Sequence, residues 1–155
     1  MKLTTTITNS KNYKYMESVL PDELITLIYY FIFGDDLYLL SNENDEINSF
    51  IFSKYSFTEG INYYMNYPLT DEFKPIFKNL LYGTAFSGNI ERMLRLKYKY
   101  YPNIITEKDL SHSIDYALEN GQINYIKYIM YMIKDGNTNL SINKWLKFCK
   151  QNRLI

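Results

Sequence analysis

The sequence predicts an all-α protein whose second half consists of stacked helix pairs, and three observations lead to this fold class. The composition is 46% hydrophobic and 17% aromatic with only four prolines and six glycines, too few for a turn-rich β-protein or a disordered chain. Apolar residues recur at helical spacing in several segments. Two segments of the second half are similar to each other, at the fixed spacing that is typical of a repeat.

The chain divides into two halves of opposite charge. Residues 1–77 carry 5 Lys and Arg against 11 Asp and Glu, whereas residues 78–155 carry 12 against 6. Residues 1–16 lack an apolar period, so we expect a flexible tail there. The sequence therefore predicts an N-terminal helical module over residues 17–77 and a repeat module over residues 78–155, whose opposite charges help the halves to dock.

The clearest single helix begins near Leu20 and ends at Gly34. Pro21 suits a first helical turn, and the two acidic residues that follow it complement the positive end of the helix dipole. The spacing predicts that one face is turned toward the core, and this face comprises Leu24, Leu27, Ile28, Phe31 and Ile32.

Two shorter helices and an irregular segment follow. Residues 36–40 predict a short helix, and a further helix begins near Asp45 with Ile47, Phe50, Ile51 and Tyr55 expected inside. Gly60, Pro68 and Pro75 divide the next stretch, for which one short helix and a loop are expected.

The strongest pattern is a repeat in the second half. When its two copies are superposed, the matched pairs are Leu81 with Ile114, Ser87 with Asn120, Gly88 with Gly121, Ile90 with Ile123, Met93 with Ile126, and Leu96 with Ile129. Each copy predicts two antiparallel helices joined at a glycine that can adopt positive φ. A third, incomplete copy follows, in which Leu146, Cys149 and Asn152 match and Arg153 stands in place of the turn glycine.

This period and pattern resemble an ankyrin repeat, in which Ala85 and Ala117 would be the small residues that precede the turn glycines Gly88 and Gly121. The resemblance implies a series of stacked helix pairs that holds a protein partner on its concave surface. The incomplete last copy adds the expectation of self-association through the C-terminal repeat.

The first helical segment resembles an F-box, over about residues 17–55. The residues that carry this resemblance are Leu20, Pro21, Glu23, Leu24, Ile28, Ile32, Asp36, Leu37, Leu40 and Ser41. It implies docking onto the adaptor subunit of a cullin-type ubiquitin ligase, with Leu20, Pro21, Leu24 and Ile28 as contacts. The alternative is that the same aliphatic residues cap the open end of the repeat stack. F-box-like and ankyrin-like segments together resemble the ankyrin families of giant DNA viruses that infect amoebae.

The sequence offers no constellation typical of an enzyme or a cofactor site. His112 is the single histidine and Cys149 the single cysteine, so neither a catalytic triad nor a zinc site is expected. A lone cysteine and a polar N-terminus favour an intracellular location, which is the host cytoplasm if the protein is viral. The longest apolar run, residues 24–33, is too short to cross a membrane. We therefore expect a non-enzymatic protein–protein interaction module without cofactor or metal.

A basic and aromatic segment leaves one alternative open. Its candidate surface residues are Arg92, Arg95, Lys97, Lys99, Tyr98 and Tyr101. Cations beside aromatic rings can hold single-stranded nucleic acid through phosphates and base stacking. The competing interpretation is a solvated helix face, because lysine and tyrosine are common throughout this chain.

Overall fold

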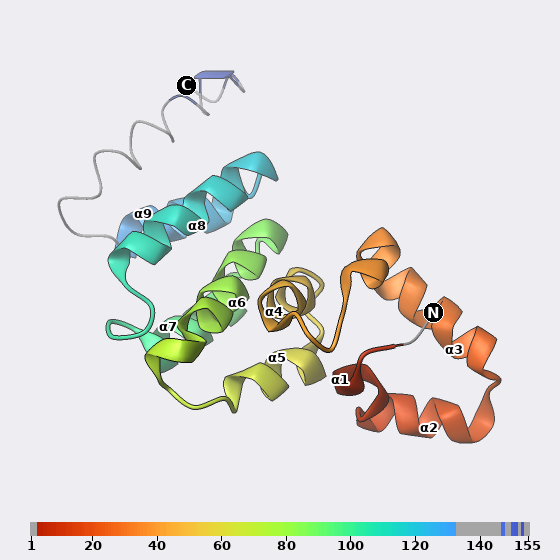
Figure 1. The fold of residues 1–155 in the computed structure, drawn as a ribbon. Helices are drawn as coiled ribbons and strands as arrows, with labels where there is room; N and C mark the ends of the chain where they lie inside the picture. The colour runs from red at the N-terminus through yellow and green to blue at the C-terminus, as the bar shows by residue number, and fades with distance from the viewer. Residues whose placement is uncertain (1–2, 133–146, 148–149, 152, 154–155) are drawn as a thin grey trace.

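The structure is a computed structural model that describes residues 3–132, 147, 150–151 and 153. Within these residues the chain is helical and contains no strand, so the all-α class is confirmed. The helices form an elongated row, with the N-terminal helices at one end and the last helix pair near the other (Figure 1).

Nine α-helices and two short 3₁₀-helices make up the described part of the chain. In order they are α1 (Thr5–Thr8), α2 (Lys11–Val19), α3 (Asp22–Phe33), η1 (Gly34–Leu39), α4 (Asp45–Lys54), α5 (Thr58–Met65), η2 (Asp71–Phe73), α6 (Lys74–Ser87), α7 (Ile90–Tyr100), α8 (Glu107–Glu119) and α9 (Ile123–Met132). Side-chain caps begin several of them, among them Asn44 at α4, Asn89 at α7 and Thr106 at α8. Residues 56–75 hold α5 followed by a loop and η2, close to the expected short helix and loop.

The N-terminal segment differs from the expected flexible tail, because two helices lie within residues 5–19. Thr4 caps α1 and Ser10 caps α2, each by accepting a hydrogen bond from a backbone N–H three residues later. Ile7 is fully buried, and α1 packs against α5. The sequence could not show this because a four-residue helix with one buried isoleucine has no apolar period.

Helix α3 turns toward the core by a different face from the one that the spacing predicted. Ile25, Tyr29 and Phe33 are buried, whereas Leu24 and Phe31 are 47% and 78% exposed. The reason is that α3 is apolar on nearly all sides, so two rows of apolar residues compete for the core. The row ending in Phe33 is buried because this ring meets those of Phe52, Tyr55 and Phe57 from α4 and the following turn, with centroids 5.4–5.9 Å apart.

Three helix pairs follow one another between α4 and α9, namely α4–α5, α6–α7 and α8–α9. The turns inside these pairs share two backbone features. The residue at the turn is left-handed in every pair: Ser56 has φ 54°, Gly88 φ 74° and Gly121 φ 65°. The next residue donates its N–H to a carbonyl five positions earlier: Phe57 to Phe52 at 2.8 Å, Asn89 to Thr84 at 2.9 Å, and Gln122 to Ala117 at 2.9 Å. By this hydrogen bond Ala117 corresponds to Thr84 and not to Ala85.

The three pairs also bury matching positions in their second helices. Two sets of residues show this, namely Ile61, Met93 and Ile126, and Tyr64, Leu96 and Ile129, all at most 1% exposed. The first helices lie side by side, α4 against α6 and α6 against α8 (Figure 1). The pair α4–α5 therefore shares its turn hydrogen bond and these buried positions with the pairs α6–α7 and α8–α9.

A glycine allows α4 and α6, two of the first helices, to approach each other closely. A β-carbon on Gly83 of α6 would lie 2.7 Å from both the amide nitrogen of Lys54 and the carbonyl oxygen of Phe50 in α4. Ser53 adds a side-chain hydrogen bond to the carbonyl oxygen of Leu80 across the same contact. Any larger residue at position 83 would push α4 and α6 apart.

The expected boundaries between modules lie inside helices. The boundary after residue 16 lies in α2 and that after residue 77 lies in α6, and one cluster of buried side chains extends from Leu3 to Ile129. The matches Leu146, Cys149 and Asn152 lie outside the described residues. Arg153 is described, and its φ of 55° and its N–H bond to the carbonyl oxygen of Lys150 at 3.3 Å repeat the turn geometry of Gly121.

Candidate functional site

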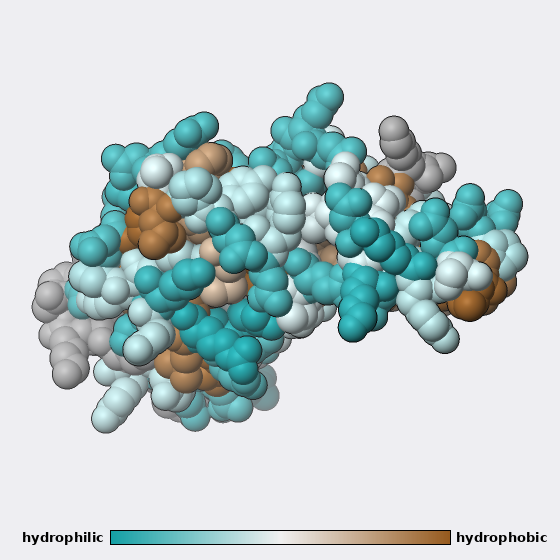
Figure 2. Space-filling model, turned by 90° about the horizontal axis from the view of Figure 1, so that it is seen from below, coloured by the Kyte–Doolittle hydropathy of each residue, from teal (hydrophilic) through white to brown (hydrophobic). Residues whose placement is uncertain are grey.

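Three surfaces of the described structure carry grouped apolar side chains: one is a helix face and two are depressions. We call them the α3 face, the front pocket and the α7 groove, and define each below by its residues. Seen from one side, the molecule is mainly polar, with hydrophobic residues gathered in a few separate patches, one at the end formed by the N-terminal helices (Figure 2).

The α3 face consists of Leu24, Leu27, Ile28, Phe31 and Ile32, the row expected to be buried. Leu24 and Leu27 are each 47% exposed and Ile32 is 39% exposed, while Ile28 is half-buried. Of the residues expected to contact an adaptor subunit, Pro21 is also exposed and Leu20 is half-buried. The four residues expected to contact an adaptor subunit are thus all at or near the surface, on one side of α3 and at its beginning.

The front pocket lies where η1 meets the first helices of the pairs. It encloses about 390 Å³ and is lined by Asp36, Leu39, Glu46, Ile47, Phe50, Ile51, Lys54, Asn79 and Tyr116. Within this lining, the ring of Phe50 lies 5.8 Å from that of Tyr116, and it lies 6.0 Å from the ring of Phe86. Contrary to expectation, Ile47 is therefore not inside but 40% exposed in this pocket.

An ion pair forms one wall of the front pocket. Lys54 Nζ lies 2.7 Å from Asp36 Oδ2 and 4.2 Å from the centre of the Phe86 ring, and Tyr55 donates its hydroxyl to the same carboxylate at 2.6 Å. Partial burial opposes ionisation of Asp36, but the hydrogen bonds from Lys54 and Tyr55 outweigh it and hold the pKa of Asp36 below its ordinary value. Burial and this carboxylate raise the pKa of Tyr55 to about 12, so its hydroxyl remains a donor at neutral pH.

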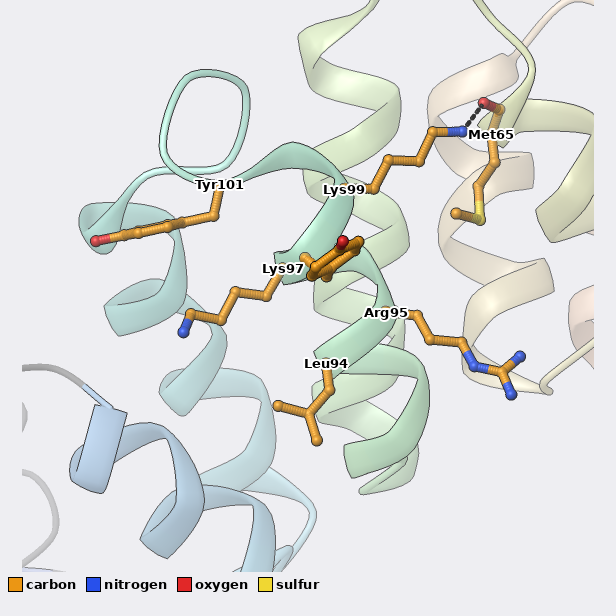
Figure 3. A pocket seen from close by; sticks show the side chains of 7 residues that line it. Met65, Leu94, Arg95, Lys97, Lys99 and Tyr101 are labelled. Carbon is orange, nitrogen blue, oxygen red and sulfur yellow. Dashed lines mark hydrogen bonds between the residues drawn. The ribbon is translucent and has the colours of Figure 1, made fainter.

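The α7 groove is an open depression of about 850 Å³ beside the second helix of the middle pair. It is lined by Met65, Leu94, Arg95, Lys97, Tyr98, Lys99 and Tyr101. Five of the six candidate basic and aromatic residues are therefore brought together here (Figure 3). The sixth, Arg92, lies half-buried outside the groove with its guanidinium 3.5 Å from Thr58 Oγ1, and burial and Arg95 lower the pKa of Arg92.

The turn glycines Gly88 and Gly121 have a structural role. Gln122, which follows Gly121, donates its side-chain amide to the carbonyl oxygen of Phe86 at 3.1 Å. Asn89, which follows Gly88, donates in the same way to Ser56 Oγ at 3.1 Å. These bonds join each turn to the preceding one, and they are made by the residues that directly follow the two glycines.

The front pocket and the exposure of the α3 face were missed from the sequence. The sequence carries no direct signal for the pocket, because its lining comes from four separate elements, η1, α4, α6 and α8. In addition, Ser56 stands in place of the turn glycine of the first pair, which hides that pair from the repeat pattern.

Within the described residues there is no group of three or more His, Cys, Asp or Glu side chains that could hold a metal ion. The helices of this part of the chain are also too short or too polar to span a membrane. Comparison of the chain with models of protein families, with curated proteins and with solved structures found no match.

Proposed function

We propose that the protein is a non-enzymatic protein–protein interaction module in which ankyrin-like stacked helix pairs form the scaffold and the α3 face binds a partner. The observation that carries this proposal is the exposure of Phe31, at 78%, in the middle of a row of aliphatic side chains. Contiguous apolar surface of this kind on a soluble domain is typical of a binding site.

The scaffold part of the proposal is supported by the turns. Ser56, Gly88, Gly121 and Arg153 follow one another at nearly equal spacing along the chain, and all have positive φ. Two helices per unit at this spacing match the ankyrin period of about 33 residues, and such stacks act by presenting surfaces to other proteins. An intracellular site of action, the host cytoplasm for a virus of the kind that the sequence resembles, belongs to the same proposal.

The α3 face also favours a second, more specific candidate, an adaptor that recruits a cullin-type ubiquitin ligase. Docking requires that Leu20, Pro21, Leu24 and Ile28 remain accessible, and none of them is among the fully buried core residues. The opposite row of α3 supports this second candidate, because Tyr29 and Phe33, rather than the four docking residues, lie against Phe57 at the start of α5.

Affinity capture from eukaryotic lysate tests both candidates. The immobilised full chain is compared with a Leu24→Ser/Leu27→Ser variant, and Leu69→Ser is the matched control because Leu69 is a 56% exposed leucine far along the chain. Proteins identified by mass spectrometry on the wild type and on Leu69→Ser, but lost on the α3 variant, would support the proposal.

One result would count against the α3 face as a binding site, and another would count against the ligase adaptor alone. If the captured proteins are the same on all three baits, the α3 face is not the binding site. If purified ligase adaptor subunit shows no binding to the wild type by calorimetry, the second candidate is removed and the general one remains.

A further inference from the structure

We infer that the α7 groove is a second binding site, which takes an acidic peptide segment carrying one large apolar side chain. The inference goes beyond the α3 face by giving a separate surface a partner of defined chemistry, and it rests on the proposed function only in that the partner is a protein. It is argued from the charge, the lining and the side-chain contacts of the groove.

The charge of α7 favours an acidic occupant. The helix carries four cationic residues against one acidic residue, Glu91. Lys97 and Lys99 lie in its last turn and line the groove with Arg95. Opposite charges on a partner would raise the association rate and select acidic segments over neutral ones.

The groove is not only a charged surface, because its lining is mostly apolar. Leu94 is half-buried in α7, and Met65 lines the groove from the end of α5 (Figure 3). Tyr98 is 94% exposed, and Tyr101 contributes its ring from the segment that follows α7. A large apolar side chain could pack against these residues while flanking carboxylates face the lysines.

The contacts of the three cations separate their roles. Lys99 donates a hydrogen bond of 2.9 Å to the carbonyl oxygen of Met65, so it joins α7 to the end of α5 and shapes the groove wall. Arg95 pairs with Glu91 at 2.6 Å and projects away from Lys97 (Figure 3). Lys97 lies 5.4 Å from the centre of the Tyr101 ring, a weak contact that leaves its ammonium group able to meet a carboxylate.

The same contacts favour a peptide over a nucleic acid. A single strand needs a row of cations that follows its phosphates, and the affinity comes mainly from those charges. Here Glu91 lies at one end of the row and Lys99 is bound to a backbone carbonyl. A peptide needs one or two cations and an apolar surface for its large side chain. Lys97 supplies the cation, and the lining of the groove supplies the apolar surface.

The test uses the full chain and a set of fluorescein-labelled peptides rich in Asp and Glu with one central Leu, Phe or Trp. Binding is followed by fluorescence anisotropy. The variants are Lys97→Glu and Tyr98→Ala, and the matched controls are Lys14→Glu and Tyr15→Ala, an adjacent Lys–Tyr pair that is exposed on α2 at the other end of the molecule. We expect saturable binding that each groove variant weakens about tenfold and the controls leave unchanged.

Three outcomes would overturn the inference. They are no saturable binding by any acidic peptide, binding that Lys97→Glu and Lys14→Glu weaken equally, and binding of a labelled single-stranded oligonucleotide in preference to the peptides. Light scattering adds a fourth outcome. If the wild type is a dimer and the Tyr98→Ala variant is a monomer, the groove binds a second copy of the chain and not a separate peptide. None of these measurements involves the α3 face, so the inference can fail while the proposed function holds.

Discussion

The side-chain amide of Gln122 donates a hydrogen bond of 3.1 Å to the carbonyl oxygen of Phe86, one helix pair earlier in the chain. The same glutamine fills the space that a β-carbon on Gly88 would occupy. Two features of the structure therefore favour glycine at position 88, namely the positive φ and the contact with the next turn. For Gly121 only the positive φ applies, because no atom of the described residues lies within 4 Å of its β-carbon position.

This difference predicts unequal costs for two equivalent substitutions. Gly121→Ala should lower the free energy of unfolding by about 1–2 kcal/mol, the cost of a left-handed backbone for a non-glycine residue. Gly88→Ala should cost about 1 kcal/mol more, because Gln122 must give up its hydrogen bond to Phe86. Urea unfolding followed by circular dichroism measures both, and in a Gln122→Ala background the two costs should become equal. Equal costs in the wild-type background would contradict the contact.

The orientation of α3 predicts opposite behaviour for two phenylalanines two residues apart. Phe33→Ala should reduce the free energy of unfolding by about 3–5 kcal/mol, because it removes a fully buried ring from an aromatic cluster. Phe31→Ala should change it by less than about 0.5 kcal/mol, because this ring is mostly in solvent. Thermal and urea unfolding of the two variants provide the measurement. A large loss for Phe31→Ala would mean that the other face of α3 is buried.

The contact at Gly83 predicts that Gly83→Ala destabilises the protein, the opposite of what the same substitution ordinarily does in a helix. Alanine in place of glycine within a helix ordinarily stabilises it by about 0.5–1 kcal/mol. Gly83→Ala should instead destabilise the protein by about 1–3 kcal/mol, because the added methyl group meets the backbone of α4. Urea unfolding shows whether the free energy of unfolding falls or rises. A stabilised Gly83→Ala variant would show that α4 and α6 are not in close contact there.

The ion pair at the front pocket predicts a pH-dependent contribution to stability. The pKa of Asp36 is lowered in the folded protein, so its stabilising effect is complete above the unfolded-state pKa of about 4 and is lost as the pH falls through the folded-state pKa. Asp36→Asn should therefore cost about 1–2 kcal/mol at neutral pH and much less near pH 2.

Unfolding in urea at the two pH values measures this difference. Asp35→Asn is the matched control, since Asp35 is exposed and the bond that its carboxylate accepts from Tyr30 is long, at 3.4 Å. A cost of Asp36→Asn that does not change with pH would show that the Lys54 and Tyr55 contacts do not depend on the charge of Asp36.

The sequence was sufficient for the helical class and for the pairs on either side of Gly88 and Gly121, because a turn glycine between two apolar periods has few alternative structures. It was not sufficient for the pair around Ser56. The backbone there is the same, but serine carries no signal of positive φ, and the hydrogen bond that Asn89 donates to Ser56 Oγ is visible only in three dimensions.

The candidate surfaces were predictable to unequal degrees. The α7 groove residues are close together in the sequence, so the charge and aromatic pattern identified most of them, whereas Met65 comes from another helix and could not be found in this way. For α3 the right residues were identified as a face and assigned to the wrong side. A helix that is apolar all round has no polar face to orient it, and the choice depends on the rings of Phe52 and Phe57, which its own sequence does not contain.

The order of contacts along the row of first helices has a consequence for how the molecule opens. Helix α6 has α4 on one side and α8 on the other, while α1 is only four residues long. Amide hydrogens in the middle of α6 should therefore exchange with deuterated solvent most slowly, through opening of the whole domain, and those of α1 fastest, through local fraying. A partner that binds the N-terminal helices should therefore slow amide exchange in α1 more than in α6.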